Sequence, residues 1–164
     1  MLLVAQLMVI LDITAVNIAL PHIAADLKLS GSTISWTITS YQLTQTISLP
    51  LAGKLADKWG RKRVFLTAVL IFTIGSIGAG LAPNIYLLIV FRVLQGMGGG
   101  MFFPSVAGVI GDVFKENRQT PIGLVATTFQ LGSVIGPNVG GLITDNLSWR
   151  WIFFVNLPVG LAIL

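Results

Sequence analysis

Long apolar runs divide the sequence into six segments that are separated by short polar or turn clusters. The runs extend roughly over Met1–Pro21, Ile34–Ala56, Val64–Ala82, Ile85–Ile110, Pro121–Ile143 and Trp151–Leu164. A helix that crosses a bilayer needs about 20 mostly apolar residues, whereas strands of a membrane barrel have about 9 to 11 residues of alternating polarity. The pattern therefore predicts an all-α integral membrane protein with five full transmembrane helices and part of a sixth.

The composition agrees with a chain that uses lipid as its solvent. Of the 164 residues, 54% are apolar and 10% are charged, while soluble domains have roughly 25% charged residues. The chain has no cysteine and one histidine, His22, which excludes thiolate sites and multi-histidine metal sites. It also has no phosphate-binding loop and no evident nucleophile and base pair. We therefore expect no enzyme activity, no metal and no cofactor.

The basic residues indicate how the chain is oriented. Lys54, Lys58, Arg61, Lys62 and Arg63 flank the second connection, Lys115 and Arg118 lie in the fourth, and Lys28 and Arg150 lie in the first and fifth. Short loops rich in Lys and Arg remain on the cytoplasmic side. The N-terminus is therefore expected in the cytoplasm, in a multi-pass protein of the cell membrane. This placement explains the pI of about 9.9 by topology and anionic lipid, without a nucleic-acid partner.

The sequence contains an internal repeat at an offset of 88 residues. Thr39–Leu66 aligns with Thr127–Phe154 without a gap, and seven of the 28 aligned pairs are identical. These pairs are Thr39/Thr127, Gln42/Gln130, Leu43/Leu131, Ile47/Ile135, Gly53/Gly141, Asp57/Asp145 and Phe65/Phe153. The offset contains three crossings, so the second copy runs in the reverse direction. The pattern predicts inverted three-helix repeats, which are typical of secondary transporters; the alternative is shared helix-end chemistry in unrelated helices.

The loop after the second run carries a motif of glycines and charges. Gly53, Asp57, Gly60 and Arg61 belong to the string G-K-L-A-D-K-W-G-R-K-R, which resembles the signature loop of the major facilitator superfamily. The glycines would permit a tight turn and a close helix approach. In that family the loop helps to hold the outward-facing state, and Asp112 resembles the acidic partner of the loop arginine. We expect these groups to form a gate; the alternative is a set of solvated surface charges.

Two charged residues lie inside apolar runs, where they are costly unless paired or hydrated. Asp12 lies near the middle of the first run, in the string L-D-I-T-A-V-N-I-A-L-P, which resembles the first-helix signature of drug:proton antiporters in the same superfamily. Arg92 resembles the fourth-helix arginine that the family associates with proton coupling. Arginine keeps its proton near pH 7, so its expected role is electrostatic. The alternatives are a structural Asp12 and an Arg92 that snorkels to the interface.

The fifth run contains small residues at every fourth position. Thr128, Gly132, Gly136, Gly140 and Thr144 form a groove along which another helix can approach closely. With Pro137 and Gly141 the string becomes G-x-x-x-G-P-x-x-G-G, which looks like the antiporter motif of the export members of the superfamily. Packing alone could also account for the glycines. The segment from Ser148 to Pro158 is similar to that of fourteen-helix drug exporters.

Together these patterns indicate that residues 1–164 are the N-terminal bundle of a transporter, truncated within the sixth helix. The resemblance implies proton-coupled export of small molecules by alternating access, with substrate, protons, lipid and a missing C-terminal half as partners. Gln42, Gln45 and Gln95 are candidates for lining the substrate cavity. The alternatives are a truncated half-transporter or packing module that transports nothing alone, and an importer of the same fold.

Overall fold

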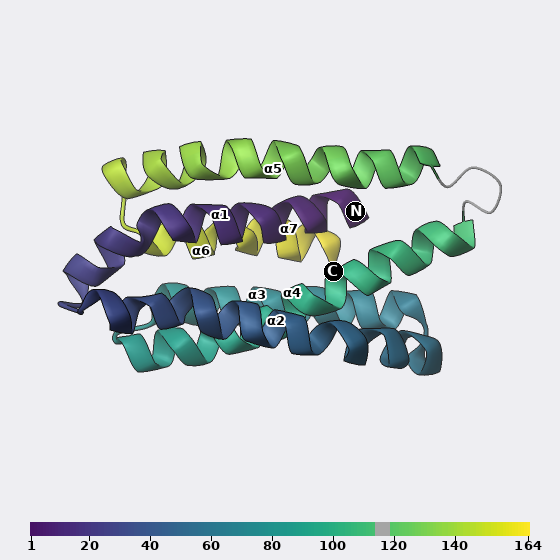
Figure 1. Ribbon diagram of the computed structural model, residues 1–164, viewed down its shortest axis with the longest axis horizontal. Coiled ribbons are helices and arrows are strands. Elements are labelled where there is room, and N and C mark those ends of the chain that lie inside the picture. Colours follow the sequence, from purple (N-terminus) through teal and green to yellow (C-terminus); the bar gives the residue numbers. More distant parts are fainter. Residues whose placement is uncertain (114–118) are drawn as a thin grey trace.

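The chain folds into a bundle of helices that lie nearly parallel to its long axis (Figure 1). The computed structural model describes residues 1–113 and 119–164, apart from the side chains of residues 112 and 113. The helices are α1 (Leu2–Asp26), α2 (Gly31–Trp59), α3 (Arg61–Leu81), α4 (Ile85–Val113), α5 (Gln119–Asn146), α6 (Arg150–Phe154) and α7 (Asn156–Ile163). The predicted all-α class is confirmed.

Two helix boundaries differ from the sequence-based expectation, and proline is involved in both. The first helix was expected to end near Pro21, but α1 continues through that proline to Asp26. The sixth segment is divided at Val155 into α6 and α7. Pro158 has no N–H to donate to the carbonyl four residues earlier, so the helical ladder is interrupted just after α6.

Helix α2 is less apolar than the other long helices. Among the described residues, α1, α3, α4 and α5 are both long and apolar enough to cross a membrane. Helix α2 has 29 residues and is therefore also long enough, but it carries many hydroxyl and amide side chains. It lies beside α4 in the same bundle. Its polarity indicates that only part of its surface faces lipid.

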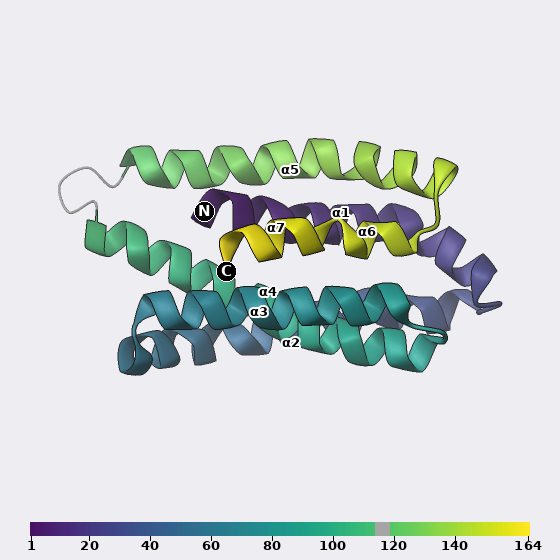
Figure 2. The same cartoon turned by 180° about the vertical axis from the view of Figure 1, so that it is seen from behind.

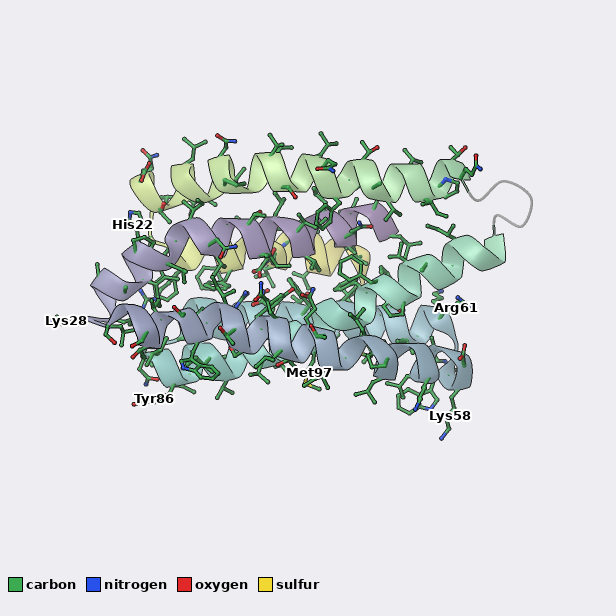
Figure 3. The ribbon with its side chains drawn as sticks, in the orientation of Figure 1. His22, Lys28, Lys58, Arg61, Tyr86 and Met97 are labelled. Atoms are coloured by element: carbon green, nitrogen blue, oxygen red, sulfur yellow. The ribbon has the colours of Figure 1, made fainter. Side chains whose placement is uncertain are left out.

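The arrangement of the helices shows the inverted repeat. Helices α2 and α5 run in opposite directions along the bundle, as both views show (Figures 1 and 2). Lys58 and Arg61 consequently lie at one end of the molecule, and His22 and Lys28 lie at the other (Figure 3). The contacts follow the same symmetry, because the second helix of each repeat packs mainly on the first helix of the other, as α2 on α4 and α5 on α1.

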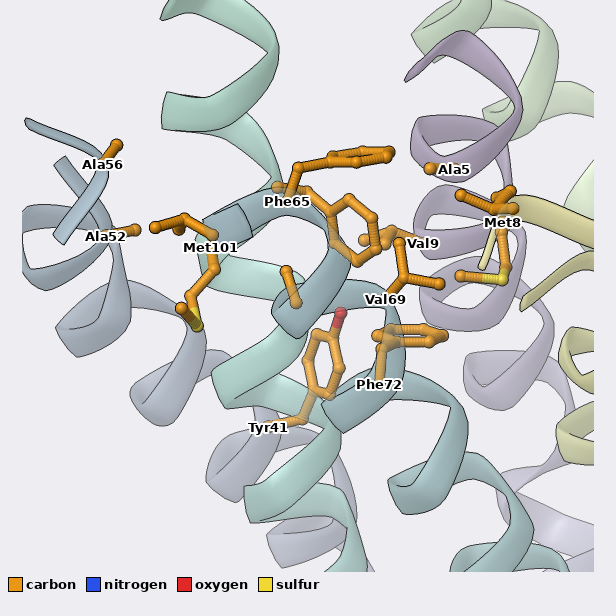
Figure 4. Packing of buried hydrophobic residues seen from close by; sticks show 14 residues of the cluster. Ala5, Met8, Val9, Tyr41, Ala52, Ala56, Phe65, Val69, Phe72 and Met101 are labelled. Carbon is orange, nitrogen blue, oxygen red and sulfur yellow. The ribbon is translucent and has the colours of Figure 1, made fainter. Parts of the chain in front are cut away.

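Apolar side chains fill two regions of the bundle interior. In the first, shown in Figure 4, the ring of Phe102 meets Phe65 and Phe72 edge to face, at centroid distances of 5.7 and 5.9 Å. In the second, Trp149 and Phe153 pack edge to face at 6.1 Å. The polar site described next lies between these two apolar regions.

Candidate functional site

A buried ion pair joins α1 to α4. Arg92 Nη1 lies 2.5 Å from Asp12 Oδ2, and the side chains are 1% and 0% exposed, respectively. The two residues are 80 positions apart in the sequence. A charged side chain inside a transmembrane bundle is tolerated when it pairs with an opposite charge, and here each charge has that partner.

Three further polar side chains complete the network around Asp12. Asp12 Oδ1 accepts hydrogen bonds from Gln95 Nε2 at 2.7 Å and from Asn156 Nδ2 at 3.0 Å. Both amides also donate to Ser76 Oγ, at 2.7 and 3.2 Å. All five side chains are buried, and they come from α1, α3, α4 and α7. The carboxylate is therefore held by one cation and two amides.

The guanidinium of Arg92 has contacts on its other sides as well. Arg92 Nη1 donates to Gln95 Oε1 at 2.7 Å, and Nε donates to the carbonyl of Thr37 at 3.3 Å. The ring of Tyr41 lies 4.1 Å from Arg92 Cζ, within the range of a cation–π contact. Arg92 is thus directed into the bundle, and the alternative of a snorkelling side chain is wrong. Sequence reasoning had not selected Tyr41, Ser76 or Asn156.

The three glutamines proposed for the substrate cavity do not come together. Gln95 lies inside the ion-pair network, Gln42 is exposed on α2, and Gln45 is half-buried against Gly99 of α4. A cavity of about 420 Å³ lies elsewhere, between α1, α4 and α5. It is lined by Leu2, Leu3, Val106, Ile110, Thr120, Pro121, Leu124 and Val125.

The small residues of α5 face α1 closely. A Cβ atom added to Gly132 would lie 2.7 Å from Ile10 Cγ2, and one added to Gly140 would lie 2.8 Å from Ala15 Cα. A Cβ on Gly136 would meet Thr14. The expected close approach of another helix along this groove is confirmed.

The other two members of this motif are placed differently. Gly141 is adjacent to a packed glycine, but a Cβ atom there would have no described atom within 4 Å. Pro137 is half-buried within α5. The string therefore has a packed face and an open face.

The charged loop forms the junction between α2 and α3. Gly60 has φ of +87°, a backbone conformation that favours glycine, so the expected tight turn is confirmed. At Gly53 a Cβ would meet no described atom within 4 Å, so the expected close helix approach there is wrong for this bundle. Asp57 is exposed. Arg61 reaches across to α4, where a Cβ on Gly108 would overlap its guanidinium.

The side chain of Asp112, the proposed acidic partner of Arg61, lies outside the described residues. Among the residues whose side chains are described, no group of three or more His, Cys, Asp or Glu could hold a metal ion.

A second polar cluster lies at the opposite end of the bundle. Asp26 Oδ2 accepts hydrogen bonds from Arg150 Nη1 at 2.9 Å and from Trp149 Nε1 at 3.0 Å. Arg150 Nη2 also donates to the carbonyl of Ala82 at 3.2 Å. This cluster links the end of α1 to the end of α3 and the start of α6. The Asp26 side chain is 49% exposed, so the pair is largely hydrated.

Comparisons with known proteins agree with this architecture. Residues 2–164 match the sequence profile described as "Major Facilitator Superfamily". The chain is 44% identical over 161 residues to the multidrug transporter protein MdtP of Bacillus subtilis (strain 168), covering 98% of the chain and 30% of the relative. It is 38% identical over 160 residues to the multidrug export protein EmrB of Haemophilus influenzae, covering 97% of the chain and 31% of the relative. The chain thus spans about 30% of the length of these relatives.

Solved structures with low sequence identity share the fold. The proton:xylose symporter XylE, bound to 6-bromo-6-deoxy-D-glucose, superposes with a TM-score of 0.81 at 16% identity and covers 99% of this chain and 42% of its own. A bacterial homologue of the human lysosomal transporter Spinster, in an inward-facing and occupied conformation, gives a TM-score of 0.83 at 19% identity, with the same coverage of 99% and 42%.

Proposed function

Because this chain belongs to the Major Facilitator Superfamily, we propose that residues 1–164 form the N-terminal bundle of a proton-coupled exporter of small, drug-like molecules. The observation that carries this proposal is the Asp12–Arg92 pair, which is held by Gln95 and Asn156 in the interior of apolar helices. Relatives named as a multidrug transporter and a multidrug exporter support the choice of substrate class.

The position of the pair suggests how a proton could alter the bundle. Helix α1 packs mainly on α5, and α4 packs mainly on α2 and α3, while α1 and α4 contact each other only slightly. The Asp12–Arg92 pair therefore bridges a seam between two groups of helices. A proton on Asp12 removes the negative charge and weakens this bridge, which couples proton binding to the relative positions of the two groups.

The charged loop between α2 and α3 is proposed to act as a gate at the end of the bundle that carries Lys58 and Arg61. Arg61 crosses from α3 to Gly108 on α4, and position 112 follows one helical turn later. In this proposal Arg61, Asp57 and Asp112 hold the outward-facing state. Arg61→Ala should shift the accessibility of the cavity toward the cytoplasm, measured by cysteine labelling at outward-facing positions; unchanged labelling and unchanged transport would contradict the gate.

The open faces of α2 and α5 are proposed to receive the C-terminal half of the transporter. Gly53 and Gly141 occupy equivalent positions in the two repeats, and a Cβ atom at either would meet no described atom. In keeping with the distribution of Lys and Arg, the protein is proposed to lie in the cell membrane with its N-terminus in the cytoplasm.

The test of coupling compares two aspartates on the same helix. Asp12→Asn and the control Asp26→Asn are introduced into the complete polypeptide that the gene encodes, and pH-driven efflux is measured in proteoliposomes. Asp12→Asn should keep the helical circular dichroism spectrum but lose the response of efflux to the pH gradient. Asp26→Asn should keep both the spectrum and the response. Full pH-driven efflux by Asp12→Asn would remove Asp12 from the mechanism.

The share of each relative that the chain covers favours a second candidate, a half-transporter that inserts but transports nothing alone. Residues 1–164 are expressed alone and together with the matching C-terminal half of a relative. Efflux from the pair only would indicate a split transporter, and pH-driven accumulation in place of efflux would indicate an importer.

A further inference from the structure

We propose that Tyr41 is a positioning residue for proton coupling: the face of its ring holds the Arg92 guanidinium in place while Asp12 is protonated. This inference rests on the proton-coupled function proposed above. The ring of Tyr41 lies 4.1 Å from Arg92 Cζ, and both side chains are 1% exposed. The contact is thus shielded from water. A cation–π interaction is stronger in such a desolvated place than at an exposed one.

Helix α4 is shaped to admit the tyrosine. A Cβ atom on Gly99 would lie 2.5 Å from Tyr41 Oη, and one on Gly96 would lie 2.5 Å from the Tyr41 carbonyl oxygen. Glycine at these two positions therefore leaves room for the phenol and lets the backbone of α2 approach α4. The ring is also a member of the apolar cluster of Figure 4, so it packs among buried side chains such as Val69 and Phe72.

The need for a second partner follows from the charges. Asp12 can take a proton from water and become neutral, but Arg92 remains a cation near pH 7. A buried cation without its counter-ion is costly, and the other acceptors of Arg92 are the neutral oxygens of Gln95 and Thr37. The electrostatic attraction of an aromatic face remains when Asp12 is neutral, and it contributes more in that state, because no carboxylate then shares the charge of the guanidinium.

The surroundings of Arg92 offer no other charge among the described side chains. Asp12 from α1 and Tyr41 from α2 are the titratable groups in contact with it. The side chains nearby from α3, α6 and α7 are Ser76, Phe153 and Asn156, which carry no charge. The Phe153 ring is farther away, at 5.8 Å.

The surroundings of the Tyr41 hydroxyl indicate whether Tyr41 acts through its ring or through a hydrogen bond. Tyr41 Oη is buried and has no hydrogen-bond partner among the described residues. The aromatic face is therefore the part of Tyr41 that acts on Arg92, and phenylalanine should replace tyrosine at this position.

The experiment follows the protonation of Asp12 directly, without transport. In the complete polypeptide reconstituted in lipid nanodiscs, infrared difference spectroscopy monitors the C=O stretch of the protonated Asp12 carboxyl, which is identified by its loss in Asp12→Asn. Tyr41→Phe should keep the titration midpoint. Tyr41→Leu removes the attraction that favours Arg92 in the protonated state, so its midpoint should fall by about one pH unit, a tenfold change in proton affinity.

A series that conserves size keeps the test valid if Tyr41→Leu does not fold. Phenylalanine with an increasing number of ring fluorines at position 41 weakens the negative face of the ring, and each step should lower the midpoint further. Equal midpoints in Tyr41→Phe and Tyr41→Leu, or across the fluorinated series, would overturn the role of Tyr41 and leave the proposed coupling intact. A carboxyl at Asp12 that never titrates would overturn both proposals.

Discussion

The two adjacent glycines near the end of α5 provide a controlled test of helix packing. Gly140 meets α1, where an added Cβ would lie 2.8 Å from Ala15 Cα and 3.0 Å from Ala15 O, whereas Gly141 has open space. Carbon atoms in contact are normally about 3.5–4.0 Å apart, so Gly140→Ala must push α1 and α5 apart by several tenths of an ångström. Overpacking of this kind costs about 1–3 kcal/mol.

Replacing glycine by alanine within a helix also gains about 0.8–1.0 kcal/mol of helix propensity, and this gain is common to both variants. The propensity gain cancels in the comparison, so Gly140→Ala should be less stable than Gly141→Ala by about 1–3 kcal/mol. The free energy of unfolding is measured on residues 1–164, where Gly141 is unpacked, by denaturant titration in mixed micelles. A Gly140→Ala protein as stable as Gly141→Ala would refute the close packing of α1 on α5.

Four further changes test separate features. Gly60→Ala should cost about 1–3 kcal/mol of unfolding free energy, because φ of +87° with ψ of 141° is a backbone conformation essentially restricted to glycine. Lys28→Gly should add about 1 kcal/mol to the stability, because Lys28 itself has φ of +52°. Ser76→Ala should cost about 1–3 kcal/mol, since it removes the shared acceptor of two buried amides. Arg150→Met should cost at most about 1 kcal/mol, because its partner Asp26 is half-exposed, and high salt should reduce the difference.

Each of these values is measured by the same unfolding assay, and the variants at Gly60 and Ser76 each have a control substitution that lacks the relevant feature. Gly31→Ala is the control for Gly60→Ala, because a Cβ atom at Gly31 would have open space and Gly31 has no positive φ. Thr46→Val serves for Ser76, because Thr46 is exposed and bonds only the carbonyl of Gln42 among the described groups. A loss at Ser76 no greater than that at Thr46 would contradict the network, and a destabilising Lys28→Gly would contradict the strain.

Much of the fold could be predicted from the sequence because the bilayer imposes a length on every crossing. The apolar runs located the five long helices, and the repeat predicted the opposite directions of α2 and α5. The helix ends were less predictable. Proline removes one backbone hydrogen bond, but its presence alone does not determine whether the helix continues. Pro21 lies inside α1, whereas Pro158 follows the break between α6 and α7.

The functional site was only partly predictable, because its members meet through tertiary packing. Asp12 and Arg92 were each selected by the cost of a charge in lipid, but their direct pairing across 80 residues depends on how α1 crosses α4. The same local reasoning placed Gln95 in a cavity, whereas it lies inside the ion-pair network. Tyr41 gave no signal, since an aromatic residue on a helix is usually part of an apolar core.

The exchange of partners between the repeats has a consequence for biogenesis. The main partners of α1 and α2 are α5 and α4, which leave the ribosome later. Until then α2, the most polar of the long helices, has no α4 to cover its hydroxyl and amide groups in the membrane. The order of synthesis therefore places α2 in the membrane before the helix that it packs against most, and a ribosome stalled between α3 and α4 would leave α2 without that partner.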